Sequence, residues 1–333
     1  MVWGVCVEFG LNPKMFGDYF EEALEQTLLA EKVGFSSVWI MEHHCNKEYL
    51  PSPMLALGTL AAHARKMKVG TNIMILPIND PVRVAEEGAM LDVLTKGKFI
   101  LGVGVGYRPA DFNTFGIPLK ERAGRMEEQL EIIKRLWTEE SVSHEGRFYR
   151  FRDVTIDPRP VQKPRPPIWI GGWMKRAIER AAEMGDAWFP GPVGELPRLE
   201  EGLRIYKDAL KRLGRDVSDL KIPLNRELYV AENHDRAVEE AKPHLIHMYL
   251  GDYAASEHPF FTGDAEESFE KIAQNRFIVG DPDECIASIE KYRSRLNVNH
   301  MVFRMHFPGI SHDRVINSIR LFGEKVIPYF AEE

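Results

Sequence analysis

The sequence predicts an α/β fold that consists of a single (β/α)8 TIM barrel over residues 1–333. Short β-branched runs alternate with long amphipathic stretches along the chain, which is typical of repeated β-α units. Eight strands are predicted, and each is followed by a helix, directly or after an inserted segment. No change of composition marks a linker between two domains, and single barrels of this kind range from about 200 to over 400 residues.

The first half of the chain supplies four of the predicted units. Gly34 is placed to end the first helix as a C-cap, and Asp80 is placed to cap a helix that begins at Pro81. Between residues 122 and 137 the apolar side chains recur on one helical stripe. The predicted strands are 3–9, 37–41, 69–76 and 99–105, and the predicted helices are 18–33, 52–65, the one that begins at Pro81, and 122–137.

The second half contains the remaining four units and two predicted insertions. Segment 141–167 follows the fourth strand and its helix, and it is expected to hold a short β-hairpin. Segment 251–274 follows the seventh strand and its helix, and it is irregular and aromatic. Both insertions are expected to cover the mouth of the barrel. The predicted strands are 168–170, 186–189, 222–231 and 298–307, and the helices are 175–184, 196–213, 235–250, 281–295 and 311–326.

Composition and charge indicate a cytoplasmic globular enzyme. Apolar residues make up 44% of the chain and charged residues 28%, which is typical of a protein with a large core. The net charge of -7 argues against general nucleic-acid affinity, which requires a basic surface. No apolar run is long enough for a membrane span, and no secretory signal is visible. Cys6, Cys45 and Cys285 lack CxxC spacing, so neither a disulfide framework nor a structural zinc site is predicted.

Candidate site residues are sought at the C-terminal ends of the strands, where barrel enzymes place their active sites. Alternation along the first strand directs Cys6 and Glu8 into the barrel mouth. Glu8 is then either a pocket-lining carboxylate or one half of an ion pair with a nearby arginine. The second strand ends in Glu42-His43-His44-Cys45, which favours acid/base chemistry. A metal site is a weaker interpretation, because no second cluster with ligand spacing follows.

Two glycine-rich segments also lie at predicted strand ends. Gly102, Gly104 and Gly106 share one face of the fourth strand, which indicates a close approach to its backbone. Either a flat ring or a bulky neighbouring side chain would use that space. A dinucleotide fingerprint is excluded by the spacing of the glycines. The Gly171-Gly172 turn precedes a helix that begins with Lys175 and Arg176, an arrangement that suits a phosphate group.

Ordered motifs at barrel-compatible spacing run through nearly the whole chain. On these motifs the chain resembles the bacterial luciferase-like superfamily of flavin-dependent monooxygenases and their deazaflavin-using (coenzyme F420) relatives. The resemblance implies a barrel that is usually dimeric and binds reduced flavin at its mouth. The motifs are Gly34-Phe35 through Trp39 to Glu42-His43-His44, Val69-Gly70-Thr71 to Leu76-Pro77, Pro81 to Glu86 with Leu91-Asp92, Gly97-Lys98-Phe99 to Gly106, Pro166 to Gly172, Gly185-Asp186 to Trp188, Leu321-Phe322 and Val326-Ile327-Pro328.

The resemblance also implies roles for individual residues. His43 matches the catalytic histidine of the family, which acts as acid or base beside the flavin. A non-prolyl cis peptide with a bulge against the flavin ring would fall at Asn72-Ile73. The phosphate site would be formed by Gly171, Gly172 and the amides of Trp173 and Met174. The sequence departs from the luciferase pattern where Gly104 replaces its reactive cysteine, where Val105 replaces its phosphate-binding arginine, and where Trp173 and Met174 replace small hydroxyl residues.

The function that these features predict is a monooxygenase. Reduced FMN and O2 would oxygenate a small apolar organic substrate through a C4a-peroxyflavin, and a separate reductase would supply the reduced flavin because the chain has no second nucleotide motif. Cys6, Glu8, Tyr107 and His306 are expected to shape the substrate pocket, and no metal is expected. The alternatives are an F420-dependent reductase or dehydrogenase on the same fold, a non-catalytic flavin-binding protein and a metal-dependent barrel hydrolase.

Overall fold

The structure is a computed structural model, and it describes residues 7–14, 20–45, 50–253 and 269–331. The strands are β1 (Glu8–Asn12), β2 (Ser37–Ile40), β3 (Lys68–Thr71), β4 (Met74–Ile75), β5 (Phe99–Gly104), β6 (Val142–Glu145), β7 (Arg150–Val154), β8 (Ile168–Ile170), β9 (Ala187–Trp188), β10 (Ile222–Val230), β11 (Ile278–Gly280) and β12 (Val298–Arg304). The α-helices are α1 (Phe20–Lys32), α2 (Pro53–His63), α3 (Pro81–Leu94), α4 (Pro109–Thr114), α5 (Arg122–Thr138), α6 (Lys175–Met184), α7 (Leu196–Arg212), α8 (His234–Ile246), α9 (Phe269–Ala273), α10 (Pro282–Leu296), α11 (His312–Leu321) and α12 (Ile327–Ala331). Shorter helical turns are η1 (Leu76–Ile78), η2 (Leu119–Glu121), η3 (His247–Tyr253) and η4 (Phe322–Val326).

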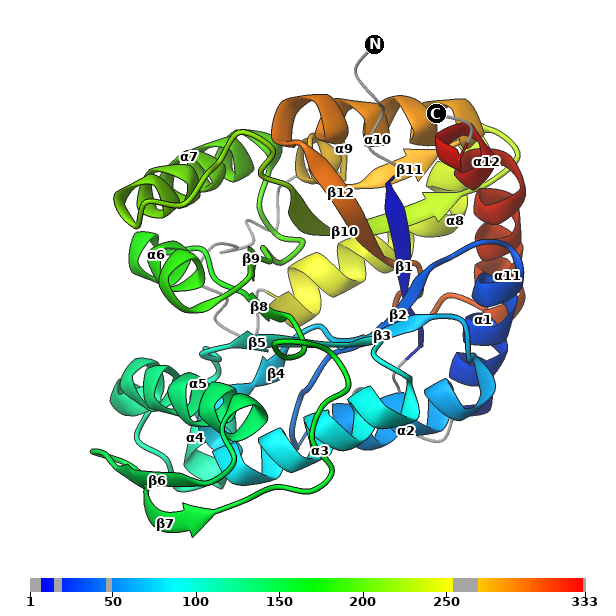
Figure 1. The fold of residues 1–333 in the computed structure, drawn as a ribbon. Helices are drawn as coiled ribbons and strands as arrows, with labels where there is room; N and C mark the ends of the chain where they lie inside the picture. Colours follow the sequence, from blue (N-terminus) through cyan, green and yellow to red (C-terminus); the bar gives the residue numbers. More distant parts are fainter. Residues whose placement is uncertain (1–6, 15–19, 46–49, 254–268, 332–333) are drawn as a thin grey trace.

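The strands form a curled parallel sheet that is surrounded by helices (Figure 1). Its order is β11-β10-β12-β1-β2-β3-β5-β8-β9, and β4 pairs with β5 beside β3. In the described part of the chain, β9 lies close to β10 but the two share no hydrogen-bonded ladder. The predicted α/β class and parallel sheet are therefore confirmed, whereas full closure of an eight-stranded barrel stays a prediction.

Local signals place most elements where the sequence predicts them. Asp80 caps α3 by accepting hydrogen bonds from the N–H groups of Val82 and Arg83. Asp281 and Glu284 form a reciprocal capping box at the start of α10. The apolar stripe of α5 is buried, and its Trp137 donates a hydrogen bond to the carbonyl of Ala85 at 2.9 Å. The caps define where α3 and α10 begin, and the Trp137 contact joins α5 to α3.

The first strand differs from its prediction. It runs from Glu8 to Asn12 rather than over 3–9, and it pairs with β12 so that Glu8 lies opposite His300 and Asn12 lies opposite Arg304. Residues 1–6 lie outside the described residues. The alternation of side chains along a strand does not fix where the strand begins. The predicted strand 3–9 begins too early, and it therefore places its residues too close to the C-terminal end of the sheet.

The two predicted insertions are covered unequally by the described residues. Segment 141–167 contains the expected hairpin, in which β6 and β7 pair antiparallel. Glu128 of α5 holds this hairpin, because its carboxylate accepts hydrogen bonds from the N–H groups of Phe148 and Tyr149 and contacts His144 Nε2 at 3.0 Å. Most of segment 251–274 lies outside the described residues. That either segment is an insertion that covers the mouth stays a prediction.

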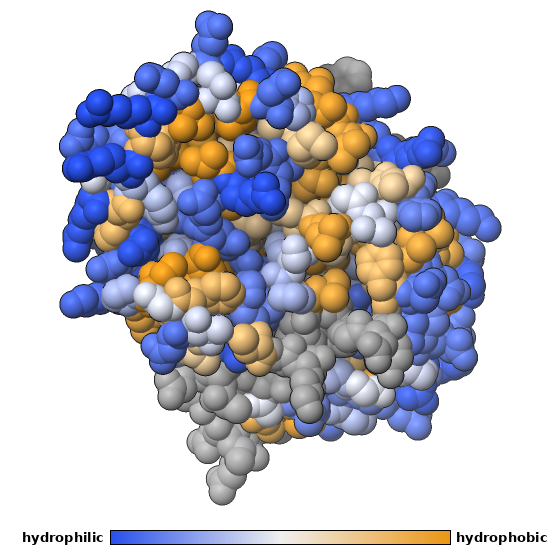
Figure 2. All heavy atoms as spheres, turned by 90° about the horizontal axis from the view of Figure 1, so that it is seen from below, coloured by the Kyte–Doolittle hydropathy of each residue, from blue (hydrophilic) through white to orange (hydrophobic). Residues whose placement is uncertain are grey.

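One side of the molecule exposes several large apolar side chains on neighbouring helices. Leu55 of α2 and Leu94 of α3 are 73% and 64% exposed, and Met90 and Val93 of α3 are also exposed. Figure 2 views the molecule from the side on which α2 and α3 lie in Figure 1, and it shows apolar patches between polar side chains.

The glycines of β5 admit the segment that follows β3. A Cβ atom at Gly102 would lie 1.9 Å from the carbonyl oxygen of Thr71, and one at Gly104 would lie 2.0 Å from Ile73 Cδ1. The Thr71 hydroxyl donates to the Gly102 carbonyl at 2.6 Å and accepts from the Gly102 N–H at 2.9 Å. Of the two interpretations of these glycines, packing against neighbouring residues is therefore confirmed.

Substituting Gly102 with alanine should destabilise the fold strongly. The added methyl group would overlap the backbone carbonyl of Thr71, so we expect Gly102→Ala to lower the free energy of unfolding by about 1–3 kcal/mol or more. Gly58 in α2 offers a matched control, because a Cβ there would have its nearest neighbour, Leu91 Cδ2, at 3.6 Å. Gly58→Ala should raise the free energy of unfolding by up to about 1 kcal/mol. Urea unfolding measures both, and equal stability of the two variants would contradict the packing argument.

Candidate active site

A cavity of about 290 Å³ lies at the C-terminal ends of the parallel strands. Residues at or after the ends of β2, β3, β5, β8 and β9 line it, together with residues of β10 and β12 and the start of α6. The cavity brings together every residue that the sequence assigned to catalysis or cofactor binding: His43, Asn72, Ile73, Gly104, Gly171, Gly172, Trp173 and Met174. Their roles stay predictions, but their convergence makes this cavity the candidate active site.

The predicted substrate-pocket residues are not all in this cavity. Tyr107 lines it. Cys6 lies outside the described residues. His306 is buried but is not part of the lining. The strand β12 ends at Arg304, before His306, and Arg304 lines the cavity instead.

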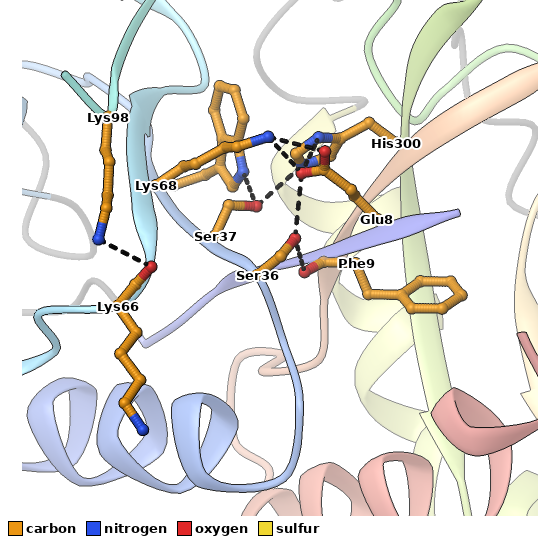
Figure 3. A network of polar contacts seen from close by, with 9 residues as sticks. Glu8, Phe9, Ser36, Ser37, Lys66, Lys68, Lys98 and His300 are labelled. Carbon is orange, nitrogen blue, oxygen red and sulfur yellow. Dashed lines mark hydrogen bonds and ion pairs between the residues drawn. The ribbon is translucent and has the colours of Figure 1, made fainter. Parts of the chain in front are cut away.

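Glu8 faces the interior of the sheet but at the end opposite the cavity, so its assignment to the substrate pocket is wrong. It begins β1, beside the first residue of β3, Lys68, whose Nζ lies 2.7 Å from both carboxylate oxygens. Figure 3 shows this network, in which Ser36 Oγ donates to Glu8 at 3.3 Å and His300 Nδ1 lies 3.5 Å from it. Burial by itself would raise the pKa of Glu8, but Lys68 and His300 hold that pKa below its usual value. The ion-pair interpretation is therefore correct, with a lysine in place of the expected arginine.

His43 is a half-buried residue in a positively charged environment. Burial is the larger cause and the nearby charges of Arg108, Arg304 and His44 add to it, so that together they lower the pKa of His43 to about 3. Both guanidinium groups line the same cavity. The imidazole of His43 is therefore neutral at physiological pH and can exchange a proton or a hydrogen bond with a bound molecule.

Glu42 holds the strand end that carries His43. Its buried carboxylate accepts hydrogen bonds from the Ile75 N–H and from Asn79 Nδ2, and it contacts His44 Nε2 at 3.0 Å. His44 lies edge-on to Phe115 at 4.6 Å and is not part of the cavity lining, so the two histidines have different environments, as the strand geometry predicts. The N–H of Glu42 also donates to the Ile73 carbonyl at 3.3 Å.

The predicted cis peptide bond between Asn72 and Ile73 is present. It divides the predicted third strand into β3 and β4, and the Ile73 side chain turns toward Gly104 and Gly171. The backbone N–H of Asn72 donates to the Ile40 carbonyl at 2.7 Å. Contacts from β2 therefore hold both residues of this bond, and both line the cavity.

The Gly171-Gly172 turn leads directly into α6 at the cavity wall. Gly172 has a φ of +148°, and a Cβ there would lie 2.5 Å from Ala177 Cβ, so only glycine suits this position. No side chain among the described residues caps the N-terminus of α6, which exposes amides that favour an anion. Arg176 pairs instead with Glu183 at 2.7 Å, and Arg122 of α5 lines the cavity.

Four polar residues of the cavity were missed by sequence reasoning: Arg108, Arg122, Asn225 and Arg304. A usable signal existed for one of them, because β10 places Asn225-Arg226-Glu227 in the middle of a fully buried strand. Polar residues at such positions require buried partners or a ligand. Arg108 lies 3.6 Å from Asp111, whose pKa is raised by burial and only partly lowered by that guanidinium.

The fold and the site define a barrel-like oxidoreductase with a cavity at the strand ends. The chain matches the family model of the luciferase-like monooxygenases over residues 4–297 and belongs to this family. No helix in the described part of the chain is long and apolar enough to cross a membrane. Within the same residues, no group of three or more His, Cys, Asp and Glu side chains is placed to hold a metal ion.

Three similar proteins indicate the breadth of the family. The chain is 31% identical to an F420-dependent glucose-6-phosphate dehydrogenase of Microbacterium testaceum, with 92% of each chain covered. It is 26% identical to the oxygenase component of a flavin-dependent trigonelline monooxygenase of Acinetobacter baylyi, which covers 94% of this chain and 90% of the relative. The crystal structure of the monooxygenase RslO1 from Streptomyces bottropensis superimposes with a TM-score of 0.86 at 27% identity, covering 97% of this chain and 99% of that one.

The neutral state of His43 should be visible in the pH dependence of stability. Its pKa in the folded chain lies far below the value in the unfolded chain, so the unfolded chain binds a proton first as the pH falls. Stability is therefore lost as the pH falls from near neutrality toward about 3. Between about pH 7.5 and about pH 5, the wild type should lose about 1–2 kcal/mol more than His43→Asn. Urea unfolding at both pH values tests this, and parallel losses in the two proteins would show that His43 titrates normally.

Proposed function

We propose that the protein is a flavin-dependent monooxygenase that uses reduced FMN and O2 to oxygenate a small, mainly apolar organic substrate. The observation that supports this most is the convergence of His43, the Asn72-Ile73 segment and the Gly171-Gly172 turn on one cavity. These residues follow β2, β3 and β8, which are separated along the chain; in the sheet β2 pairs with β3, and β5 lies between β3 and β8. Their convergence supports one binding site for a ring and a phosphate, within a single domain.

The cavity has the chemical features that FMN requires. The uncapped N-terminus of α6 and the guanidinium of Arg122 would hold the phosphate group. Asn72 and Ile73 would lie against the flavin ring. Gly104 and Gly171 have no side chains, and this leaves the space that Ile73 occupies. When bound, reduced FMN would supply the electrons that activate O2.

The chain itself would control water and protons. Apolar side chains of Met41, Ile75, Phe189 and Val193 line the cavity and disfavour water beside the reacting atoms. The neutral imidazole of His43 would accept or return a proton next to the ring without adding a charge. The same apolar walls, with the Tyr107 ring among them, favour a small apolar substrate over a highly charged one.

Two associations complete the proposal. A separate reductase would supply reduced flavin, since the trigonelline enzyme that resembles this chain is an oxygenase component and the chain has no second nucleotide motif. A homodimer would cover the apolar side chains that α2 and α3 expose, among them Leu55 and Leu94.

A second candidate function is an F420-dependent dehydrogenase, which would transfer hydride without O2. The identity of 31% to the F420-dependent enzyme of Microbacterium testaceum favours it. Both functions would use the same cavity. Each cofactor carries a flavin-like tricyclic ring, which would lie beside Ile73, and a phosphate group, which would lie beside α6.

Anaerobic titration followed by O2 distinguishes the two functions. Intrinsic tryptophan fluorescence would measure binding of reduced FMN and of reduced F420 to the wild-type protein, and each complex would then be mixed with O2. We expect reduced FMN to bind, and its oxidised absorbance to return in two phases, because the apolar cavity shields the ring from water. Binding of F420 alone would overturn the proposed monooxygenase in favour of the dehydrogenase.

The role of His43 can be separated from cofactor binding. In single turnovers with reduced FMN, O2 and a panel of small aldehydes, ketones and aromatic compounds, mass spectrometry would detect oxygenated product. We expect His43→Ala to slow product formation by roughly 100-fold or more, because a positioned acid or base contributes about that factor. The dissociation constant for reduced FMN should change by no more than about threefold. A collapse of affinity would instead make His43 a binding residue, and unchanged product formation would show that His43 is not the acid or base. Absence of product with the wild type would favour a non-catalytic binding protein.

A further inference from the structure

Two buried asparagines from opposite parts of the chain meet at the wall of the candidate active site. Asn72 follows β3 and Asn225 lies within β10, and both line the cavity. The side-chain amide of Asn225 donates a hydrogen bond from Nδ2 to Oδ1 of Asn72 at 3.2 Å. The residues are only 8% and 4% exposed, so water has little access to either amide.

The hydrogen bond between the two amides leaves one amide nitrogen and one amide oxygen without a partner. Each primary amide carries two N–H donors on nitrogen and an oxygen that accepts. Among the described residues, neither Asn72 Nδ2 nor Asn225 Oδ1 has a hydrogen-bond partner. Leaving such groups buried and unmatched is unfavourable, so a donor and an acceptor placed together at a cavity wall indicate a ligand that satisfies both.

This conclusion does not depend on how the two amides are oriented. Oxygen and nitrogen of an asparagine amide are exchanged by a half-turn of the group, and hydrogen-bond networks decide between the two orientations. If both amides are turned, Asn72 donates to Asn225, and the pair then presents the Asn72 oxygen and the Asn225 nitrogen. In either orientation the cavity receives one amide N–H2 group and one amide oxygen.

We propose that this pair binds the imide edge of the flavin ring, where the N3–H group donates and a neighbouring ring carbonyl accepts. An imide edge presents a donor next to an acceptor, which is the complement of the asparagine pair. The arginines of the cavity, Arg108, Arg122 and Arg304, can only donate hydrogen bonds and cannot receive the N3–H. This inference rests on the proposed flavin function and adds Asn225, on the far side of the sheet, to the cofactor site.

The placement of the pair explains how one cavity could hold the two ends of the cofactor independently. Asn72 directly precedes Ile73, so a ring that lies on Ile73 has the asparagine pair at its edge. The phosphate site at Gly171-Gly172 belongs to β8 and α6, which contribute nothing to the asparagine pair. Because FMN and F420 share the imide edge, the pair would select for this ring and not for one of the two cofactors.

The test compares FMN with 3-methyl-FMN, in which a methyl group replaces the N3 hydrogen. Anaerobic fluorescence titration would give the dissociation constants of both reduced ligands. The wild-type protein should bind 3-methyl-FMN more weakly than FMN by roughly tenfold or more, because the acceptor at the asparagine pair then has no donor. Equal affinity of the wild type for the two ligands would overturn the inference without any variant.

The Asn225→Ala variant completes a double-mutant cycle with the ligand. It removes the amide and leaves room for the methyl group, so its preference for FMN over 3-methyl-FMN should fall to within about twofold. Asn12→Ala is the matched control, because Asn12 is also a fully buried asparagine but does not line the cavity. It should keep the wild-type preference.

The outcomes separate this inference from the proposed function. A preference that persists in Asn225→Ala, or that is lost equally in Asn12→Ala, would overturn the role of the asparagine pair while the flavin function stands. Failure of the wild type to bind reduced FMN, reduced F420 and 3-methyl-FMN would overturn the proposed function, and the inference with it. If Asn225→Ala does not fold, the wild-type comparison of the two ligands still decides.

Discussion

The close contact between the segment after β3 and the glycine-bearing face of β5 is the constraint on which the site depends. The carbonyl group of Thr71, the last residue of β3, occupies the space that a side chain at Gly102 would need, and its hydroxyl bonds to the Gly102 backbone. Because Gly104 is also without a side chain, Ile73 can turn over it toward Gly171. The two glycines therefore place Asn72 and Ile73 at the cavity, and a cofactor ring would use the surface that they create.

Glu42 stabilises the same arrangement from the other side. Its carboxylate binds the Ile75 N–H and the Asn79 side chain, and its own N–H binds the Ile73 carbonyl. A buried carboxylate with several donors is satisfied in this position, whereas removal of the carboxylate would leave those donors unmatched. His43 follows Glu42 directly, so one residue fixes both the strand end that carries the histidine and the segment on which the ring would lie.

The sequence predicts the order of elements well because each β-α unit has its own periodicity and its own caps, as Asp80 and Asp281 show. It predicts the motif residues at strand ends because a parallel sheet places those ends together. The sequence does not fix the start of the first strand, because the side chains still alternate when the strand is shifted along the chain. Glu8 was therefore assigned to the wrong end of the sheet. Asn225 carried a signal as a polar residue within a buried strand, but its partner Asn72 lies across the sheet, and Arg122 comes to the cavity through tertiary packing that no local pattern shows.

The charges of the cavity explain why a neutral histidine and an anionic cofactor suit the same site. The chain as a whole carries a net charge of -7, yet three guanidinium groups, those of Arg108, Arg122 and Arg304, line the cavity. Burial and this positive potential both disfavour protonation of His43. The same potential stabilises a phosphate at α6 and any negative charge on a reduced ring, so binding of the anion offsets the cost of holding these cations together. With such a cofactor bound, a substrate would meet a site whose positive charge is neutralised, with mainly apolar walls and an uncharged imidazole beside the proposed ring position.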